Sequence, residues 1–535
     1  MQDIHSVGKN FKKNLIFFKN ILIYKKKIVI LQKKIMATIA NLKPENVFKH
    51  FYALTQIPRP SKHEEKVIDF MKKFGEGLGL KTIVDKTGNV IIRKPASKGM
   101  EKCEGIILQA HLDMVPQSND KSFDFTTQPI ETYVDGEWVK AKGTTLGADN
   151  GIGVAAAMAV LEDKNLVHGP IECLFTVDEE TGMTGAFGLE KGCLEGKILL
   201  NLDSEEEGEI FIGCAGGVDV EAKLSFKTEK PQEDYEAYRI DIQGGKGGHS
   251  GVDINLGRAN TNKLLFRFLN HCLYKFDIRL SEAQGGNMRN AIPRESYAIV
   301  LVYVDDAAKF EAEVKNFDSI IKKEFAETEG ELTMFATKTQ MPEDVIRQDY
   351  AEDIIKSIFA CPHGVERMSY ATPGIVETSN NLAIVNCNNM DPDTKCVAKY
   401  QDRYKGIMNV CCLTRSSVDS AKEGTMYKIG TIFDLIGAYV KFDGAYPGWT
   451  PNPNSTIVKI MKETYEKMYG VTPKINAIHA GLECALFSKV YPDWDMVSFG
   501  PTLQYPHSPD ERLNIPSVTK FYDLLLEVLK NAPKK

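Results

Sequence analysis

The chain has 535 residues and a mass of 59.7 kDa, more than one hydrophobic core usually holds, so we expect two domains, or three. Hydrophobic residues make up 43% and charged residues 26%, which excludes disordered, collagen-like and multi-span membrane chains. Residues 1–35 contain nine Lys, one Asp and no Arg or Glu, so of the formal charge of −6 the remaining residues carry −14. An acidic body argues against nucleic-acid binding.

The eleven cysteines are scattered along the chain, and no two of them form a C-x-x-C pair. Only Cys411 and Cys412 are adjacent. Without a secretory segment, this pattern is typical of reduced cytosolic thiols and not of a disulfide framework or a zinc ribbon. We therefore expect a cytoplasmic protein.

Residues 1–35 alternate short apolar blocks with lysines. No block approaches the roughly 18 apolar residues of a membrane span. None resembles the unbroken apolar region of about 7–15 residues that a signal peptide requires. One interpretation is a basic membrane-surface or targeting segment. The other, which we prefer, is that translation begins at Met36, where the composition becomes ordinary.

From Pro44 to about residue 217, predicted strands alternate with predicted helices. Apolar spacing predicts helices over 47–54 and 67–71, strands over 90–92 and 105–108, a helix over 151–161, and strands over 171–177 and 198–202. This alternation predicts an α/β sheet with helices on both faces.

After about Gly217 the pattern becomes α+β and stays so to about Gly444. It includes strand-like runs at 238–242 and 297–304 and a helix at 307–325, followed later by a helix at 455–469, a strand at 496–499 and a helix at 518–529. We predict one α/β catalytic domain, formed by residues 36–217 and 445–535, which a large α+β domain at 218–444 interrupts.

Histidine and acidic residues follow the buried strands of the first part. They are His111-Leu112-Asp113, Asp149-Asn150, Glu179-Glu180 and Asp203. Singly, each has an ordinary explanation as a capped turn, a helix N-cap or a solvated surface pair. Together they deliver one His and at least four carboxylates to the strand ends, where open α/β sheets bind ligands. Such negative charge is costly unless cations neutralise it, and Zn²⁺ or Mn²⁺ suits these ligands.

Nine motifs in order show that the chain resembles a known family. AHLDMV, GADNGIGVA, DEETGMTGA and NLDSEE resemble the catalytic motifs of the M20 metallopeptidases. GGHSGVDI, GGNMRNAIPRE, YPGW, IHAGLECALF and FGPTLQYPHSPDE narrow the resemblance to the aminoacyl-histidine dipeptidases of that family. It extends from about Met36 to the C-terminus and departs at Ala485, where the family's pattern has Gly.

The resemblance implies a catalytic domain like that of the di-metal aminopeptidases, with an inserted lid and two divalent metal ions. We expect Zn²⁺, with Mn²⁺ or Co²⁺ as alternatives. His479 competes with His507 as the last ligand, but the resemblance places His479 near the substrate. The implied ligands are His111 and Asp203 for one ion, Glu180 and His507 for the other, and Asp149 as the bridge.

Three further residues receive catalytic roles from the resemblance. Asp113 would fix the imidazole of His111, because two residues apart on a strand they share a face. Glu179 would be the general base that takes a proton from a metal-acidified water and passes it to the departing amine. His249, in the inserted lid, would donate to the oxyanion of the tetrahedral intermediate.

Substrate contacts are less sharply indicated. Arg415 could clasp the substrate's terminal carboxylate with its guanidinium, and a surface salt bridge is the alternative. Arg289 and Asn290 are further candidates, together with His479. The glycine cluster at 244–248 lacks the spacing of a phosphate-binding loop, and Ser416-Ser417 has no nucleophile-elbow motif.

We therefore predict a cytosolic di-metal dipeptidase whose substrates are Xaa-His and related dipeptides. An N-acyl amino acid deacylase or a tripeptidase on the same scaffold is the nearer alternative, and a non-catalytic binding protein is the more distant one. We expect no nucleic-acid partner and no stable membrane span. A homodimer is left open.

Overall fold

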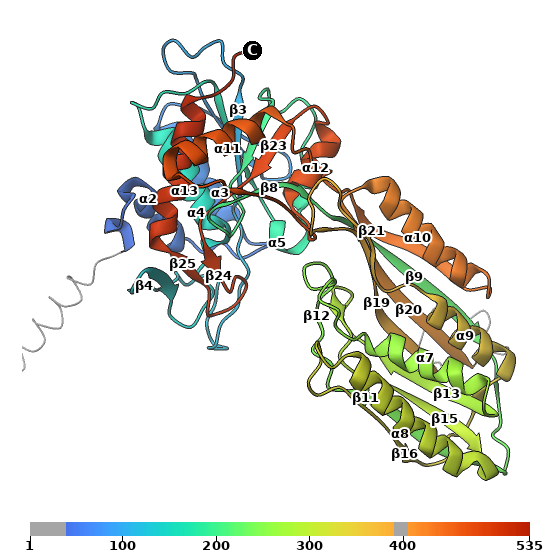
Figure 1. Cartoon of the computed structure of the whole chain (residues 1–535). Helices are drawn as coiled ribbons and strands as arrows, with labels where there is room; N and C mark the ends of the chain where they lie inside the picture. The colour runs from blue at the N-terminus through green and yellow to red at the C-terminus, as the bar shows by residue number, and fades with distance from the viewer. Residues whose placement is uncertain (1–38, 390–404) are drawn as a thin grey trace, which may run out of the picture. The chain divides into compact units, whose positions relative to one another are not determined.

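The computed structural model describes residues 39–389 and 405–535, so the prediction about residues 1–35 lies outside the described residues. The chain divides into two compact units (Figure 1). The first comprises Met1–Glu207 and Phe499–Lys535, and the second comprises Gly208–Ser498. Within the described ranges, no helix is both long and apolar enough to cross a membrane. The domain boundaries at 217/218 and 444/445 stay predictions.

Five strands of the first unit lie side by side in the order β1-β2-β6-β3-β7. The central strand β3 pairs in parallel with β6 and with β7, so the carboxyl ends of these three strands meet at one edge. All three are buried along their length, which explains why their sequences are mostly apolar. The strands are β1 (Lys81–Val84), β2 (Val90–Lys94), β3 (Ile106–His111), β6 (Ile171–Thr176) and β7 (Ile198–Asn201).

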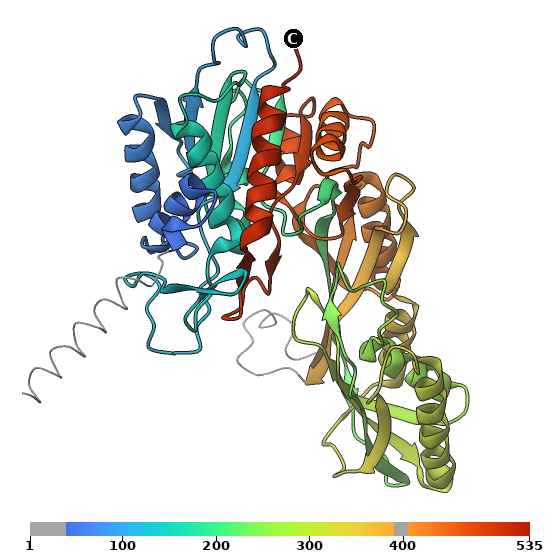
Figure 2. The same cartoon turned by 60° about the vertical axis from the view of Figure 1, so that its left-hand side comes forward.

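Helices accompany this sheet as predicted (Figure 2). The helix α4 packs against β3 and α2, and α3 packs against β1 and β2. Nearly every side chain of α4 is buried, which explains why its sequence is apolar all round. The helices are α2 (Glu45–Thr55), α3 (Glu65–Gly77), α4 (Ala148–Glu162), α5 (Glu179–Gly182), α6 (Thr184–Gly188) and α13 (Ile515–Lys530).

A second, smaller sheet of the first unit joins segments that are far apart in the sequence. Its four short strands run in the order β24-β25-β5-β4. The strand β25 pairs antiparallel with β5, with Arg512 opposite Lys140. The strands are β4 (Thr132–Asp135), β5 (Trp138–Ala141), β24 (Leu503–Gln504) and β25 (Arg512–Asn514).

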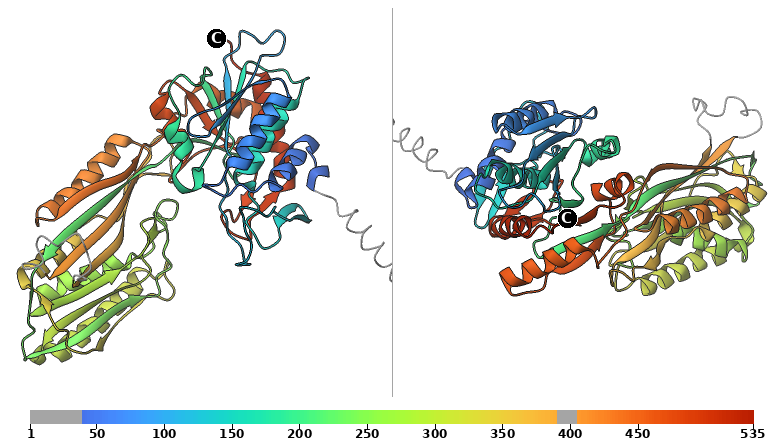
Figure 3. Two further views of the ribbon diagram at one scale, coloured as in Figure 1. Left: turned by 180° about the vertical axis from the view of Figure 1, so that it is seen from behind. Right: turned by 90° about the horizontal axis from the view of Figure 1, so that it is seen from above.

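The second unit is built around a nine-stranded antiparallel sheet with helices α7, α8, α9 and α10 on one face (Figure 3, right). Its order is β16-β11-β15-β13-β19-β20-β9-β21, with β18 paired to β19. The strands are β9 (Gly216–Phe226), β11 (Tyr235–Gln243), β13 (Ile278–Gly285), β15 (Ser296–Tyr303), β16 (Thr333–Lys338), β18 (Gly364–Met368), β19 (Val376–Asn389), β20 (Gly406–Ser416) and β21 (Tyr439–Tyr446). The helices are α7 (Thr261–Leu273), α8 (Ala307–Glu324), α9 (Gln348–Ala360) and α10 (Asp419–Asp434).

This large sheet consists of two halves with the same topology. One half follows the order β11-α7-β13-β15-α8-β16 along the chain, and the other follows β9-α9-β19-β20-α10-β21. The first half is inserted after β9 of the second, and the two meet where β13 pairs with β19. One continuous apolar core lies under both halves, so this part of the chain is a single packed body.

The remainder of the second unit contains three strands in the order β23-β8-β22 and two helices. These are β8 (Glu209–Cys214), β22 (Lys474–Ile478), β23 (Asp495–Ser498), α11 (Thr456–Tyr469) and α12 (Glu483–Val490). Two short antiparallel pairs lie outside the large sheet: β10 (Thr228–Glu229) with β17 (Val345–Ile346), and β12 (Gly248–His249) with β14 (Ala291–Ile292). The predicted α/β fold with a large α+β insertion is confirmed.

Candidate metal centre

The edge of the first sheet gathers the acidic and imidazole residues that follow its strands. His111 is the last residue of β3, and Glu179 and Glu180 open α5 directly after β6. Asp203 follows β7, and Asp149 lies in the first turn of α4 with a non-helical backbone conformation. Because β3, β6 and β7 are parallel neighbours, their ends bring these side chains together.

Asp149 lies between two imidazoles. Its Oδ1 is 3.1 Å from Nε2 of His111, and its Oδ2 is 3.1 Å from Nε2 of His507. On the first side, Nε2 of His111 is 3.4 Å from Oδ1 of Asp203. On the second side, Nε2 of His507 is 3.0 Å from Oε2 of Glu180. The structure thus brings together all five residues predicted as ligands, with Asp149 in the middle.

The electrostatics of this cluster indicate an excess of buried negative charge. Burial raises the pKa of Asp203 to about 6, and the nearby carboxylates of Asp149 and Glu180 add to this. Burial also raises the pKa of Glu180. Hydrogen bonds to Asp149 and Glu180 raise the pKa of His507 to about 11. Positive charge is therefore favoured at this cluster.

The donor atoms fit divalent cations. Ligand atoms of His111, Asp149 and Glu180 all lie within 4.8 Å of one another. Among the described residues, Oε1 of Glu180 and Oδ1 of Asp203 are buried and have no hydrogen-bond partner, although Nε2 of His111 is 3.4 Å from the latter. Buried carboxylate oxygens without donors are costly unless a cation binds them. Imidazole nitrogen with carboxylate oxygen is a ligand set that suits Zn²⁺ and its neighbours.

The carboxylate of Asp113 contacts both His111 and the backbone of Glu179 and Glu180. Its Oδ1 is 3.3 Å from Nδ1 of His111, the nitrogen that points away from Asp149. Its carboxylate also accepts the backbone N–H groups of Glu179 at 3.0 Å and Glu180 at 3.2 Å. Burial opposes the charge of Asp113, but His111, the N–H of Glu179 and the hydroxyl of Ser61 lower its pKa to about 2. We expected Asp113 to contact His111 because both would lie on one face of a strand, and this reason is wrong. The strand β3 ends at His111, and Asp113 lies in the loop that follows it.

The second unit contains a separate polar cluster around Arg415. Its guanidinium lies 3.3 Å from Oγ of Ser250, 3.0 Å from the hydroxyl of Tyr446 and 3.5 Å from Nε2 of His249. His479 lies nearby, with its backbone oxygen close to Gly251 and its Nε2 2.7 Å from Oγ of Ser379. Sequence reasoning missed Tyr446, whose signal was the YPGW motif.

The hydrogen bonds of His249 fix its tautomer. Its Nδ1 accepts the backbone N–H groups of Gly251 and Val252, each at 3.2 Å. Burial and the charge of Arg415 lower the pKa of His249 to about 4, so the ring is neutral at pH 7. The single proton is then on Nε2, the atom that faces Arg415. Two donors 3.5 Å apart, one of them cationic, form a place for an anionic oxygen.

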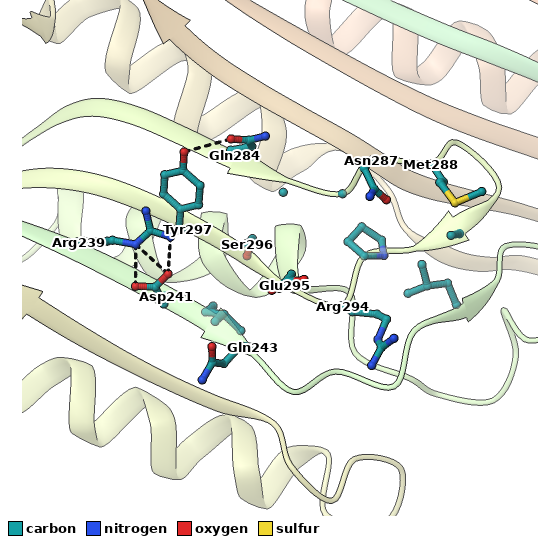
Figure 4. A pocket seen from close by; sticks show the side chains of 16 residues that line it. Arg239, Asp241, Gln243, Gln284, Asn287, Met288, Arg294, Glu295, Ser296 and Tyr297 are labelled. Carbon is teal, nitrogen blue, oxygen red and sulfur yellow. Dashed lines mark hydrogen bonds and ion pairs between the residues drawn. The ribbon is translucent and has the colours of Figure 1, made fainter.

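The other two predicted substrate residues have local partners. Arg289 is half-exposed and pairs with Asp219 at 3.0 Å. Asn290 accepts the backbone N–H of Ser250 through its own backbone oxygen, at 2.8 Å. The loop that carries both residues borders a cavity of about 570 Å³. In that cavity Arg239 lies over the ring of Tyr297 and pairs with Asp241, and the hydroxyl of Tyr297 donates to Gln284 (Figure 4).

Family comparison gives the class of this protein. Residues 107–531 match the model of peptidase family M20/M25/M40, and the chain belongs to that family. The family is metal-dependent, and the carboxylate and histidine cluster of the first unit can bind metal.

Two relatives resemble the chain over nearly its whole length. It is 43% identical over 501 residues to the cytosol non-specific dipeptidase of Escherichia coli, covering 94% of this chain and 100% of that one. The crystal structure of the aminoacylhistidine dipeptidase from Vibrio alginolyticus superposes with a TM-score of 0.86 at 43% identity, with the same shares covered. A tripeptidase from Staphylococcus aureus shares the fold, with a TM-score of 0.56 at 14% identity over 92% of this chain and 99% of that one.

Proposed function

We propose that this peptidase is a metal-dependent dipeptidase that hydrolyses Xaa-His and related dipeptides. The observation that supports this most strongly is the arrangement of Asp149 between His111 and His507, with the carboxylate of Glu180 3.0 Å from Nε2 of His507. Both full-length relatives carry the name of a dipeptidase, and one of them is named for aminoacyl-histidine substrates. The preference for histidine dipeptides rests on that second relative and on the sequence motifs.

The proposed ligand set assigns each side chain one task. His111 and Asp203 would hold one divalent ion, His507 and Glu180 the second, and Asp149 would bind both. Zn²⁺ is the ion that we propose, with Mn²⁺ or Co²⁺ as alternatives, since all three accept imidazole and carboxylate ligands.

Glu179 is proposed as the general base. When bound, the ions supply Lewis acidity that polarises the scissile carbonyl and acidifies the attacking water. Glu179 takes the proton of that water and delivers it to the departing amine. Asp113 supports this role because it holds the backbone N–H of Glu179 and, through the same carboxylate, the ring of His111. Two adjacent carboxylates are needed, since a tightly bound ligand cannot also carry the proton.

The polar cluster of the second unit is proposed to bind the anionic parts of the substrate. Nε2–H of His249 would donate to the oxyanion that forms at the attacked carbonyl. The guanidinium of Arg415 would bind the terminal carboxylate of the dipeptide. The side chains proposed to shape this site are those of His479, Arg289 and Asn290. Residues 218–444, which contain all of these substrate-binding residues except His479, are proposed to act as a lid.

A substrate panel tests the proposed function. We expect Zn²⁺-loaded protein to cleave β-Ala-His, Gly-His and Ala-Ala, and to leave N-acetyl-alanine intact, because a dipeptidase requires a free amine where a deacylase accepts an acyl group. The released amino acids are quantified by chromatography, with an EDTA-treated sample as the control. Cleavage of N-acetyl-alanine alone would replace the proposal with a deacylase, and cleavage of tripeptides in preference would favour a tripeptidase. No turnover with metal bound would favour a non-catalytic binding protein.

The role of Arg415 predicts a selective loss of substrate binding. Arg415→Lys keeps the charge but loses the planar fork, so a charge-assisted hydrogen bond of about 1.5–3 kcal/mol is removed. We expect KM for Gly-His to rise about 10- to 150-fold, with a smaller change in kcat. Steady-state kinetics measure this, with Arg267→Lys as a matched control on the surface helix α7 of the same unit. An unchanged KM in Arg415→Lys would remove this residue from the proposed site.

The cellular location is proposed from two observations. The E. coli relative is named a cytosol protein. None of the ten cysteines in the described ranges forms a disulfide. We propose that the protein works in the cytoplasm, where thiols stay reduced.

A further inference from the structure

The carboxylate of Glu511 binds four consecutive backbone N–H groups of the loop that leads into α4. Its Oε2 accepts the N–H of Leu146 at 2.7 Å and of Gly147 at 3.0 Å. Its Oε1 accepts the N–H of Ala148 at 2.8 Å and of Asp149 at 3.3 Å. Glu511 is only 2% exposed. A single buried side chain therefore fixes the backbone from which the central carboxylate of the cluster projects.

Arg59 binds the same loop through the backbone oxygen of Gly147. Its guanidinium donates to the backbone oxygen of Gly147 and, at 2.8 Å each, to those of Leu112 and Asp113. Arg59 is also 2% exposed. It therefore ties the loop before Asp149 to the loop after His111, so the backbones of two ligand-bearing segments share one buried cation.

Gly147 makes the close approach possible. Its φ is +66°, in the left-handed region that favours glycine. A Cβ at this position would lie 2.7 Å from Nη2 of Arg59 and 2.8 Å from Sδ of Met114. Glu511 and Arg59 can both bind the backbone of this loop only because residue 147 has no side chain.

The small second sheet positions Glu511 next to the loop before Asp149. Glu511 immediately precedes β25, and β25 pairs with β5, the strand that runs into the 142–147 loop. His507 lies four residues before Glu511, so one short segment carries both a predicted ligand and the carboxylate that holds the backbone of Asp149. The positions of His507 and Asp149 are thereby coupled through two strands and four hydrogen bonds.

We propose that Glu511 is a positioning residue that sets the metal affinity of the centre by fixing the backbone of Asp149, with Arg59 supporting it from the opposite side. This inference rests on the proposed metal centre but not on the identity of the substrate. Residues that orient metal ligands typically affect metal affinity by about 10- to 100-fold when they are replaced. Neither residue touches the reacting atoms, so neither is a catalytic residue.

The test compares Glu511→Gln with Glu172→Gln. Glu172 is a matched control because it is also a buried carboxylate of the first unit. It accepts the N–H groups of Glu195 and Gly196 at 2.7 and 2.8 Å and pairs with Arg93, on β2. Both variants replace two acceptor oxygens by one acceptor and one donor, so both lose thermal stability. The Zn²⁺ affinity, measured by competition with a chromophoric chelator, separates them.

We expect Glu511→Gln to weaken Zn²⁺ binding about 10- to 100-fold and Glu172→Gln to leave it unchanged. Wild-type affinity in folded Glu511→Gln, or an equal loss in Glu172→Gln, would overturn the inference. If Glu511→Gln does not fold, Arg59→Lys is the second test. This variant keeps the charge but loses the planar guanidinium that donates to Gly147. Unchanged Zn²⁺ affinity in Arg59→Lys would also overturn the inference. Wild-type protein that binds Zn²⁺ without cleaving dipeptides would contradict the proposed function alone, because the affinity comparison needs no substrate.

Discussion

Glu179→Gln is expected to lower kcat/KM for Gly-His by about 10²- to 10⁴-fold while leaving Zn²⁺ affinity unchanged. The amide keeps the size of the side chain but cannot take a proton from water. Asp113 holds this position through the backbone N–H of residue 179, so the substitution leaves that contact in place. Steady-state kinetics and chelator competition on the same preparation measure the two quantities.

Glu190→Gln is the matched control for this substitution. Glu190 is an exposed carboxylate of the same unit and pairs with Lys86 at 2.9 Å. It should retain wild-type kinetics. Near wild-type turnover in Glu179→Gln would mean that another group accepts the proton. A parallel loss of Zn²⁺ would mean that Glu179 serves as a ligand.

Asp149→Asn is expected to remove metal binding and activity together. One carboxylate faces both imidazoles, so its loss takes a ligand from both proposed ions at once. Metal ions typically supply several kcal/mol of transition-state stabilisation, so kcat/KM should fall by about 10³-fold or more. In wild-type protein, Zn²⁺ at a hundred times its Kd should stabilise the fold by about 2.7 kcal/mol for each ion bound, and the variant should lose this gain.

Differential scanning calorimetry with and without Zn²⁺ measures this gain. Asp163→Asn is the control, because Asp163 follows the last residue of the same helix α4, far along it from Asp149. It should respond to Zn²⁺ as wild type does. An undiminished rise of Tm with Zn²⁺ in Asp149→Asn would place the metal elsewhere.

The elements of the first unit could be predicted from local sequence because its strands and helices have strong patterns. The strands β6 and β7 are mostly apolar, with Glu172 as the charged exception in β6, and an acidic residue follows each of them by the second position. The end of such a run is visible in the sequence to within a residue or two. The acidic and histidine residues at these strand ends were therefore recognisable from their positions, whereas His507 was recognisable only from its motif.

The residues that hold those ligands could not be predicted in the same way. Glu511 contacts a loop more than three hundred residues away because β25 pairs with β5, and neither strand is long enough to show a periodic pattern. Arg59 donates to backbone oxygens, which every residue type has, so the sequence of the contacted residues does not predict these hydrogen bonds. Asp113 lies 3.3 Å from its predicted partner His111, but it does so from the loop after β3 and not from the strand itself.

The strand order of the second unit also could not be predicted from local sequence patterns. Strand and helix runs were visible, but the insertion of one βαββαβ half inside another depends on which strands pair. The pairing of β13 with β19 joins segments about a hundred residues apart through antiparallel backbone hydrogen bonds. Such pairing follows from the packing of the common core and not from the sequence of either strand.

The most direct test of the central claim is a titration of metal-free protein with Zn²⁺ in which bound metal and Gly-His hydrolysis are measured on the same samples. The proposed centre predicts no hydrolysis without metal, and activity that rises with bound Zn²⁺ and levels off when the cluster around Asp149 is filled. Full hydrolysis by the metal-free protein, or no hydrolysis once Zn²⁺ is bound at this cluster, would contradict it.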